Sequence, residues 1–403
     1  MAPICCIVPE HVLEKIVERG QAPEHVINAC QSTIDKTKEL HNIRIARGQS
    51  LLASQGQQPS EGIIPPYIHE RIAQHAVTED QRDSFLRTFT HDTENPLAAG
   101  TVRHLNRTVY NAQNSTEDLP RDDIMIKEHG ALISKEQDPS TDANECYAGF
   151  GKTYDFYFQF FNRDSINGRG LKLDGFVHFG KGYLNAFWDG SEMVFGDGDG
   201  LVFNGFTDEL DVIGHELTHG VVQYSSPLDY SFQSGALNES LADVFGIMIK
   251  QWGEDPENPQ TADQSNWLIG EGIWANGIKG RALRDMKAPG TAYDDERVGS
   301  DPQPAHWKDF KRLPLTSDRG GVHINSGIPN YAFYLASTRI GGYSWQTAGP
   351  IWYKALNSGK LSGNATFKEF ADLTVLYAGE HEAKIREAWS QVGHPFDDSR
   401  HEL

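Results

Sequence analysis

The 403-residue sequence lacks the features that define several protein classes. It has no uninterrupted apolar run of about 18 residues, so no membrane-spanning helix is predicted. The first ten residues contain no basic stretch, and prolines break their apolar part, unlike a secretory signal peptide. The expected location is therefore the cytoplasm, or the outside of the cell after secretion by an unconventional route.

Basic charge and cysteine are also scarce. Lys and Arg number 36 against 56 Asp and Glu, and the formal net charge of −20 argues against nucleic acid or an anionic membrane as partner. Four cysteines are too few for a disulfide scaffold and fit a reducing compartment. The length and the hydrophobic content of 38% are those of a globular protein with two or three domains.

The first hundred residues differ in pattern from the rest of the chain. Two amphipathic stretches, Val8–Arg19 and Ile63–Ala76, predict helices, and the Gln/Ser/Gly-rich stretch Gly48–Gly62 predicts a linker. Both helices are entered through an apolar-proline sequence, Ile7-Val8-Pro9 and Ile64-Pro65-Pro66, because proline fits the first position of a helix. We interpret this as a duplicated motif, with coincidental helix chemistry as the alternative.

The remainder predicts an α+β protein with two lobes. Aromatic-rich stretches at 154–161 and 175–179 predict strands, and Gly196–Gly200 predicts a turn. Beyond residue 208 helical periodicity dominates, over 208–224, 235–252, 326–338 and 366–378. We expect a β-rich lobe at 101–224 and an α-helical lobe at 225–403, with the active site in the cleft between them.

One predicted helix contains the sequence His215-Glu216-Leu217-Thr218-His219. Histidines four residues apart project from one helix face, which suits two of the three protein ligands of a catalytic zinc ion. Glu216 faces another way and could accept a proton from the attacking water instead of binding the metal. A surface helix with two unrelated histidines is the alternative.

The next predicted helix supplies the missing carboxylate. Glu239 follows His219 at a distance that allows a turn and a second, antiparallel helix, so it is the candidate third ligand. Asp243 lies one turn later, where its carboxylate could hydrogen-bond a ligating imidazole and fix its tautomer. The combined set predicts one catalytic Zn²⁺ held by His215, His219 and Glu239.

Over about residues 101–403 the chain resembles the thermolysin family of zinc endopeptidases. The similarity lies in these blocks, in order: Asn185–Trp188, Met193–Gly200, the His-Glu-Leu-Thr-His helix, Gly235–Asp243, Ala282–Met286 and Gly320–Gly327. The resemblance implies a two-lobed fold with the zinc helix at the cleft. It also implies an endopeptidase that cleaves peptide bonds preferentially before hydrophobic residues.

The resemblance assigns the remaining catalytic roles. His323 matches the histidine that donates a hydrogen bond to the developing oxyanion, a form of electrostatic stabilisation. Asp318 matches the carboxylate that orients this imidazole. Tyr230 matches the phenol that assists at the same oxyanion.

The resemblance also implies how a peptide substrate is held. Asn185 and Ala186 match the edge segment that pairs with the substrate backbone, and Arg284 matches the arginine near the primed-side carbonyl. An apolar pocket for the residue after the scissile bond is implied at matching positions, although each alone also fits an ordinary core residue: Phe203, Val212, Ile269 and Leu283.

Residues 1–100 are similar to the short pro-segment of the protealysin branch, through Ile64-Pro65-Pro66-Tyr67. This resemblance implies an intramolecular inhibitor whose Pro-Pro-Tyr stretch lies in or beside the cleft. Maturation by cleavage between about Ala76 and Arg121 is our hypothesis. Cys5 or Cys6 could also ligate zinc in the latent form, because thiolate is a good zinc ligand; ordinary reduced thiols are the other interpretation.

The chain departs from the family at the position of its paired calcium site. Asp211 and Glu271 keep two expected carboxylates, but Lys250, Asn266 and Leu268 replace others. Calcium needs six to eight oxygen ligands, largely anionic, so this site is predicted to be absent or degenerate, with the Lys250 ammonium in an ordinary salt bridge. Asp197 and Asp199 resemble calcium ligands, but their glycine-rich surroundings favour a turn.

Two other functions remain alternatives. An aminopeptidase could share the zinc spacing, but no Gly-x-Met-Glu-Asn-type element for a free amine appears. A catalytically silent homologue acting as a binding or inhibitory module would be expected to have lost Glu216 or a zinc ligand, and every one is present.

Overall fold

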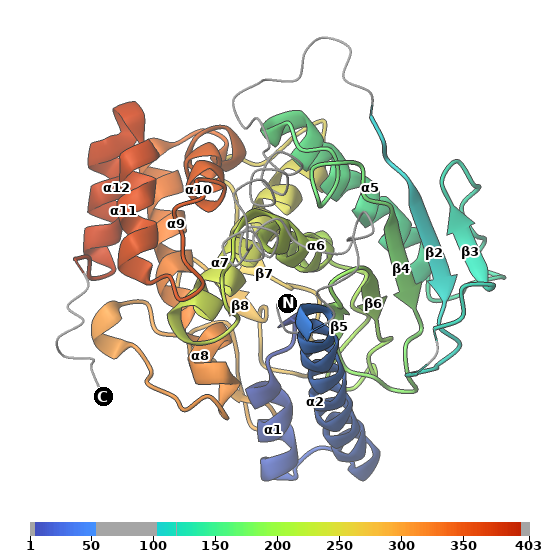
Figure 1. Cartoon of the computed structure of the whole chain (residues 1–403). Helices are drawn as coiled ribbons and strands as arrows, with labels where there is room; N and C mark the ends of the chain where they lie inside the picture. Colours follow the sequence, from blue (N-terminus) through green and yellow to red (C-terminus); the bar gives the residue numbers. More distant parts are fainter. Residues whose placement is uncertain (1–4, 54–102, 118, 396–403) are drawn as a thin grey trace.

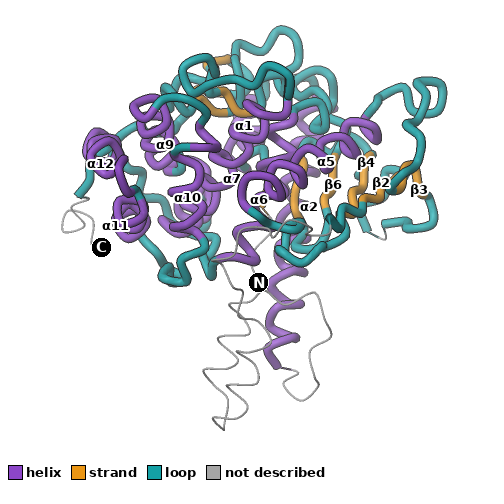
Figure 2. Tube along the Cα trace, turned by 90° about the horizontal axis from the view of Figure 1, so that it is seen from above, coloured by secondary structure: helices purple, strands orange, loops and turns teal. Residues whose placement is uncertain are grey.

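The computed structural model describes residues 5–53, 103–117 and 119–395, with the backbone alone for 41–53. The chain forms a β-rich lobe and a helical lobe, with α6 and α7 between them (Figure 1). The sheet and the helices α9 to α12 also lie at opposite sides in the view from above (Figure 2). The two-lobed α+β arrangement is the one that the sequence predicts.

Six strands of the described residues form the main sheet, in the order β1-β5-β6-β4-β2-β3. Strand β4 runs parallel to β2 and β6, and the other neighbours are antiparallel. In chain order the strands are β1 (Cys5–Cys6), β2 (Arg107–Asn111), β3 (Ile124–Lys127), β4 (Leu173–Val177), β5 (Ala186–Trp188) and β6 (Met193–Phe195). The edge strand β1 therefore comes from the predicted pro-segment and lies against β5.

Helix α5 (Asp142–Phe161) corrects one prediction, because it includes the stretch 154–161 that was expected to be a strand. It packs against β2 and β4 on one side and against α6 on the other. Tyr157 is fully buried and its hydroxyl lies 2.7 Å from Oγ1 of Thr218 on α6. Burial on several sides of the helix places aromatic residues nearly all around it, so the aromatic content was mistaken for β-propensity.

The helical lobe follows α6 (Leu210–Ser225) and α7 (Phe232–Gly253). Its further helices are α8 (Asp318–Asn325), α9 (Gly327–Ile340), α10 (Ala348–Leu356), α11 (Phe367–Tyr377) and α12 (Glu382–Gln391), with short 3₁₀ turns at Trp307–Asp309, Ser344–Gln346 and Gly379–His381. Two small antiparallel pairs join β7 (Leu268–Ile269) to β8 (Arg284–Asp285) and β9 (Asp294–Asp295) to β10 (Gly299–Ser300). No helix in the described part is both long and apolar enough to cross a membrane.

The N-terminal segment continues from β1 into α1 (Glu10–Arg19) and α2 (Glu24–Ala53). Pro9 caps α1, and Gly20 ends it in the left-handed conformation that glycine adopts readily. Helix α2 lies against the loop before β5, where the Leu184 N–H donates to Oγ1 of Thr33 at 3.1 Å. Because α2 extends to Ala53, the predicted linker Gly48–Gly62 is helical in its first part. Its remainder, and the predicted helix at 63–76, lie outside the described residues.

Candidate active site

Helices α6 and α7 approach each other closely because glycines stand at their contact. A Cβ added to Gly246 would lie 2.7 Å from the backbone oxygen of Asp211, and one at Gly214 would lie 3.3 Å from Cα of Gly246. Larger residues would force the helices apart. This close contact brings the two histidines of α6 next to Glu239 of α7, as the antiparallel pairing predicts.

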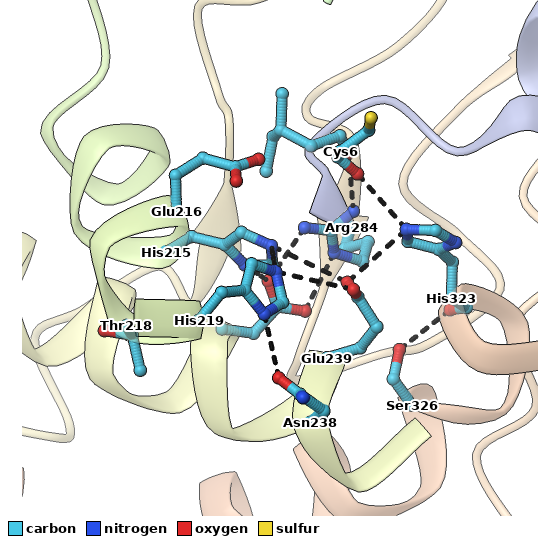
Figure 3. A network of polar contacts seen from close by, with 12 residues as sticks. Cys6, His215, Glu216, Thr218, His219, Asn238, Glu239, Arg284, His323 and Ser326 are labelled. Carbon is cyan, nitrogen blue, oxygen red and sulfur yellow. Dashed lines mark hydrogen bonds and ion pairs between the residues drawn. The ribbon is translucent and has the colours of Figure 1, made fainter. Parts of the chain in front are cut away.

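Three ligand atoms converge at this contact. The Nε2 atoms of His215 and His219 lie 3.0 Å apart, and the Glu239 carboxylate lies 3.6 Å from the first and 3.4 Å from the second. Donor atoms that share a tetrahedral zinc at about 2.0–2.1 Å are about 3.4 Å apart. Figure 3 shows Glu239 pointing toward both imidazoles.

The opposite ring nitrogens of the two histidines are already engaged. Nδ1 of His215 lies 2.8 Å from Oδ1 of Asp243, and Nδ1 of His219 lies 2.8 Å from Oδ1 of Asn238. Both partners are acceptors, so each Nδ1 carries the proton and each Nε2 presents a lone pair. Burial lowers the pKa of His219 to about 3, which keeps its ring neutral. Two lone pairs and a carboxylate facing one another form a donor set that suits a cation.

Glu216 lies beside this cluster without joining it. Its Oε2 accepts a hydrogen bond of 3.0 Å from the backbone N–H of Trp188 on β5. Within the described part of the chain, its buried Oε1 has no hydrogen-bond partner. Burial, and then the nearby Glu239 carboxylate, raise the pKa of Glu216 well above its ordinary value. A carboxylate in such surroundings is a stronger base than one in water.

Asp243 connects His215 to Arg284. The Arg284 guanidinium donates to both Asp243 oxygens at 2.8 Å, and Nδ2 of Asn330 donates to Oδ2 at 2.8 Å. Burial by itself raises the pKa of Asp243, but Arg284 and then His215 outweigh it and hold the pKa below its ordinary value. The carboxylate therefore stays ionised and fixes the tautomer of His215.

A tight turn positions His323 on the other side of the cluster. Residues Asp318 to Gly321 all have positive φ angles, and this conformation turns Asp318 back onto the helix that follows. Oδ1 of Asp318 lies 2.6 Å from Nδ1 of His323, and Oδ2 accepts the His323 N–H at 3.0 Å. Burial lowers the pKa of His323, but Glu239 and then Asp318 outweigh it and raise the pKa to about 9. The ring is therefore a cationic donor at neutral pH.

Tyr230 completes this side of the site. Its hydroxyl donates to Oε1 of Glu239 and lies 3.2 Å from Nε2 of His323. The structure thus brings Tyr230, His323, Asp318 and Glu239 together, as the predicted roles require. The direct contact between Tyr230 and Glu239 was not predicted.

The cleft holds the N-terminal strand β1. Cys5 and Cys6 pair with Trp188 and Phe187 of β5, and the Ile7 N–H donates to the backbone oxygen of Ala186 at 3.2 Å. Further contacts of this segment use predicted substrate-binding residues: Asn185 exchanges two hydrogen bonds with Val8 (2.9 and 3.0 Å), and Nη1 of Arg284 donates to the Ile7 oxygen at 3.2 Å. Nε2 of His323 donates to the Cys6 oxygen at 3.2 Å (Figure 3).

Comparisons with known proteins agree with this geometry. Residues 81–223 match the thermolysin metallopeptidase catalytic domain, and residues 226–394 match the thermolysin metallopeptidase alpha-helical domain. The chain is 43% identical over 358 residues to protease PrtS of Photorhabdus sp. (strain Az29), covering 83% of this chain and 92% of that protein. The chain belongs to the thermolysin family of metallopeptidases.

Two further relatives show how far the likeness extends. An extracellular metalloprotease of Pectobacterium carotovorum subsp. carotovorum is 43% identical over 83% of this chain and 97% of its own length. The solved structure of the precursor of protealysin, a metalloproteinase from Serratia proteamaculans, is 46% identical, with a TM-score of 0.67, and covers 83% of this chain and 99% of that one. The predicted family, fold class and metalloendopeptidase activity are confirmed.

Two residues of this peptidase were missed by the sequence reasoning. Asn238 holds the Nδ1 proton of His219, and its place directly before Glu239 on the same helix is the signal that could have indicated it. The backbone N–H of Trp188 binds Glu216, and no sequence pattern reveals a main-chain donor. Both act on residues that the motif identified.

The four predicted pocket residues are buried within one continuous apolar cluster that also contains Ile7. Leu283 precedes Arg284, and its N–H donates to the Ile269 oxygen at 3.0 Å. Phe203 stacks on Trp274 with the ring centres 5.1 Å apart. The remaining member, Val212, lies on the first turn of α6. The substrate-contacting surface of this pocket stays a prediction.

Lys250 lies among three carboxylates. Its Nζ lies 3.2 Å from Glu209, 3.5 Å from Asp211 and 3.7 Å from Glu271. Burial lowers the pKa of Lys250, but Asp211 and then Glu209 outweigh it and raise the pKa, which keeps the ammonium charged. The salt bridge to Asp211 and Glu271 was predicted, whereas that to Glu209 was not.

The Asp199 side chain accepts hydrogen bonds from its own loop. Its Oδ1 accepts the backbone N–H groups of the residues Leu201, Val202 and Phe203 at 2.8–3.0 Å. This is the turn chemistry that the glycine-rich sequence favours.

Proposed function

We propose that this chain is a latent zinc endopeptidase in which His215, His219 and Glu239 hold the metal. The observation that supports it is the convergence of two imidazole lone pairs on a buried carboxylate whose Oε2 receives no hydrogen bond from any described residue. Zinc supplies Lewis acidity and makes water more acidic when bound at such a site. The donor set of two histidines and one glutamate leaves a position for that chemistry.

The chain's own residues then have separate roles in hydrolysis. Glu216 accepts the proton of the attacking water and passes it to the leaving amine. His323, held by Asp318, donates from Nε2 to the oxyanion, and Tyr230 assists there. Asp243 acts as a positioning residue for His215. The pKa directions of Glu216 and His323 suit a base and a cationic donor respectively.

Substrate specificity follows from the way Ile7 is held. Its N–H donates to the Ala186 oxygen, and its carbonyl oxygen accepts from Arg284. Asn185 binds the backbone of the next residue, Val8. Its side chain is fully buried in the apolar cluster that contains the predicted pocket. A substrate in the same place would therefore present a hydrophobic residue after the scissile bond, in a pocket made by Phe203, Val212, Ile269 and Leu283.

Latency arises because residues 5–8, near the start of the pro-segment predicted at 1–100, occupy the substrate's place. The contacts of Cys5–Val8 with β5, Arg284 and His323 support the role of an intramolecular inhibitor. The predicted stretch for this role, Ile64–Tyr67, lies outside the described residues. The lobe boundaries 101–224 and 225–403, and cleavage between about Ala76 and Arg121, stay predictions. A relative named as extracellular favours action outside the cell over the cytoplasm.

Removal of the metal tests the zinc assignment. The processed protein should contain about one zinc per chain, lose its hydrolysis of casein on dialysis against a chelator, and regain it with zinc. Replacing Asp243 by Asn should weaken zinc affinity by about 10–100-fold, because the tautomer of His215 is no longer fixed. Asp372→Asn, at an exposed carboxylate of α11, is the matched control. Full activity in zinc-free protein would contradict the proposal.

Calcium should not stabilise the chain at Lys250. Because the Lys250 ammonium already lies beside Glu209 and Asp211, where a calcium ion would have to bind, the unfolding temperature should be the same with calcium and with a calcium chelator. Lys250→Glu should create a carboxylate cluster that binds calcium. Calcium at 100 times its Kd should then raise the free energy of unfolding by about 2.7 kcal/mol. Lys354→Glu, at an exposed site, is the control. An unfolding temperature of the parent chain that rises with calcium would refute this.

A further inference from the structure

The segment in the cleft is held as a substrate would be, which raises the question of why it is not cut. The Cys6 carbonyl oxygen accepts from His323, and the Ile7 carbonyl oxygen accepts from Arg284. The Cys6–Ile7 peptide bond therefore lies beside the groups that this family uses for hydrolysis. A substrate-like strand inhibits durably only if something also keeps the attacking water away.

Strand geometry decides which cysteine faces the metal ligands. Neighbouring side chains of a strand point to opposite faces. The side chain of Cys6 joins the apolar cluster with Phe187 and Tyr183. In Figure 3 its sulfur points away from His215 and His219. Cys5 must then face the other way, and its side chain indeed packs with Tyr230 and Val322, next to Glu239.

The thiol of Cys5 lies beside two of the three proposed zinc ligands. One ligand atom each of Cys5, His219 and Glu239 lie within 4.8 Å of one another, and all three residues are buried. An independent sign of a missing ligand comes from Glu239, whose buried Oε2 accepts no hydrogen bond from any described group; Nε2 of His215 and Nε2 of His323 each lie 3.6 Å from it. Histidine, carboxylate and thiolate are all good zinc ligands.

We propose that Cys5 is the fourth zinc ligand of the uncleaved chain, an inference that rests on the zinc site proposed above. The thiol loses its proton to solvent as the sulfur–zinc bond forms, and the thiolate takes the position that the attacking water needs. When the strand leaves, the bond breaks, the sulfur regains a proton and water returns. The strand is thus an inhibitor because two contacts act together: Cys5 binds the zinc, and the substrate-like backbone binds Arg284 and His323.

X-ray absorption at the zinc edge tests this directly on the full-length chain. All proteins carry Glu216→Gln, so that the pro-segment stays uncleaved. The parent should show one sulfur at about 2.3 Å beside nitrogen and oxygen at about 2.0–2.1 Å. Cys5→Ser should lose the sulfur shell, and Cys6→Ser, the matched control on the neighbouring residue, should keep it.

The outcomes separate this inference from the proposed function. A parent with one zinc per chain and only nitrogen and oxygen ligands would overturn the role of Cys5 and leave the peptidase assignment intact. The parent spectrum decides this even if a variant fails to fold. A sulfur shell that persists in the spectrum of Cys5→Ser, or one that is lost from the spectrum of Cys6→Ser, would also overturn the role of Cys5. A parent that binds no zinc would overturn both proposals.

Discussion

Replacing Glu216 by Gln should lower kcat of the processed enzyme by about 10²–10⁴-fold, the usual contribution of a general base. The amide keeps the shape of the side chain and can stay near the Trp188 N–H, but it cannot accept a proton from water. Because Glu216 is not among the three converging ligands, zinc content should remain near one per chain. Initial rates on a fluorogenic peptide, together with metal analysis, measure both quantities.

The control for this variant is Glu380→Gln, at a carboxylate that is almost fully exposed in the helical lobe. It removes the same charge far from the cleft and should leave kcat unchanged. A zinc-loaded Glu216→Gln enzyme with kcat within tenfold of the parent would refute the assignment of Glu216 as the base.

Replacing Ile7 by Asp should release the strand from the cleft. The Ile7 side chain is fully buried in apolar surroundings, and burying a carboxylate there costs several kcal/mol. At 1.4 kcal/mol for each factor of ten, the equilibrium between docked and released strand should shift by about 10²-fold or more. The uncleaved Ile7→Asp chain should therefore hydrolyse a peptide much faster than the uncleaved parent.

Initial rates must be taken while intact mass shows the pro-segment still attached. Ile7→Val keeps the apolar side chain and should stay latent. Val17→Asp, at a partly buried position of α1, tests whether a charge elsewhere in the pro-segment has the same effect. Latency unchanged in a zinc-loaded Ile7→Asp chain would show that this strand does not control access to the site.

The grouping of the proposed zinc ligands was predictable because these residues lie at helical spacings. His215 and His219 are one turn apart, as are Glu239 and Asp243, so each pair shares a helix face whatever the rest of the chain does. The contact of Asp243 with His215, 2.8 Å, follows from this spacing once the helices pack. Only the family resemblance could indicate His323, because Tyr230 and Glu239, which lie beside its Nε2, come from distant segments.

Other features could not be predicted, because they depend on what surrounds an element. Helix α5 is buried on several sides, so its aromatic residues follow packing and not helical periodicity. Glu209 joins Lys250 only because α6 begins beside the end of α7. The sequence pointed to Ile64–Tyr67 as the inhibitory stretch. Cys5–Val8 lies in the cleft, since the contacts of β1 are made with main-chain atoms of β5 that carry no sequence signal.

The place of β1 in the sheet has a consequence for the mature enzyme. Once β1 leaves, β5 becomes the edge of the sheet, and its main-chain groups can pair only with another extended segment. Helices and most folded loops cannot offer such a segment. Backbone conformation should therefore select cleavage sites before any side chain enters the pocket. Unfolded stretches, including those that join the lobes of damaged proteins, would be cut first, and compact domains would survive.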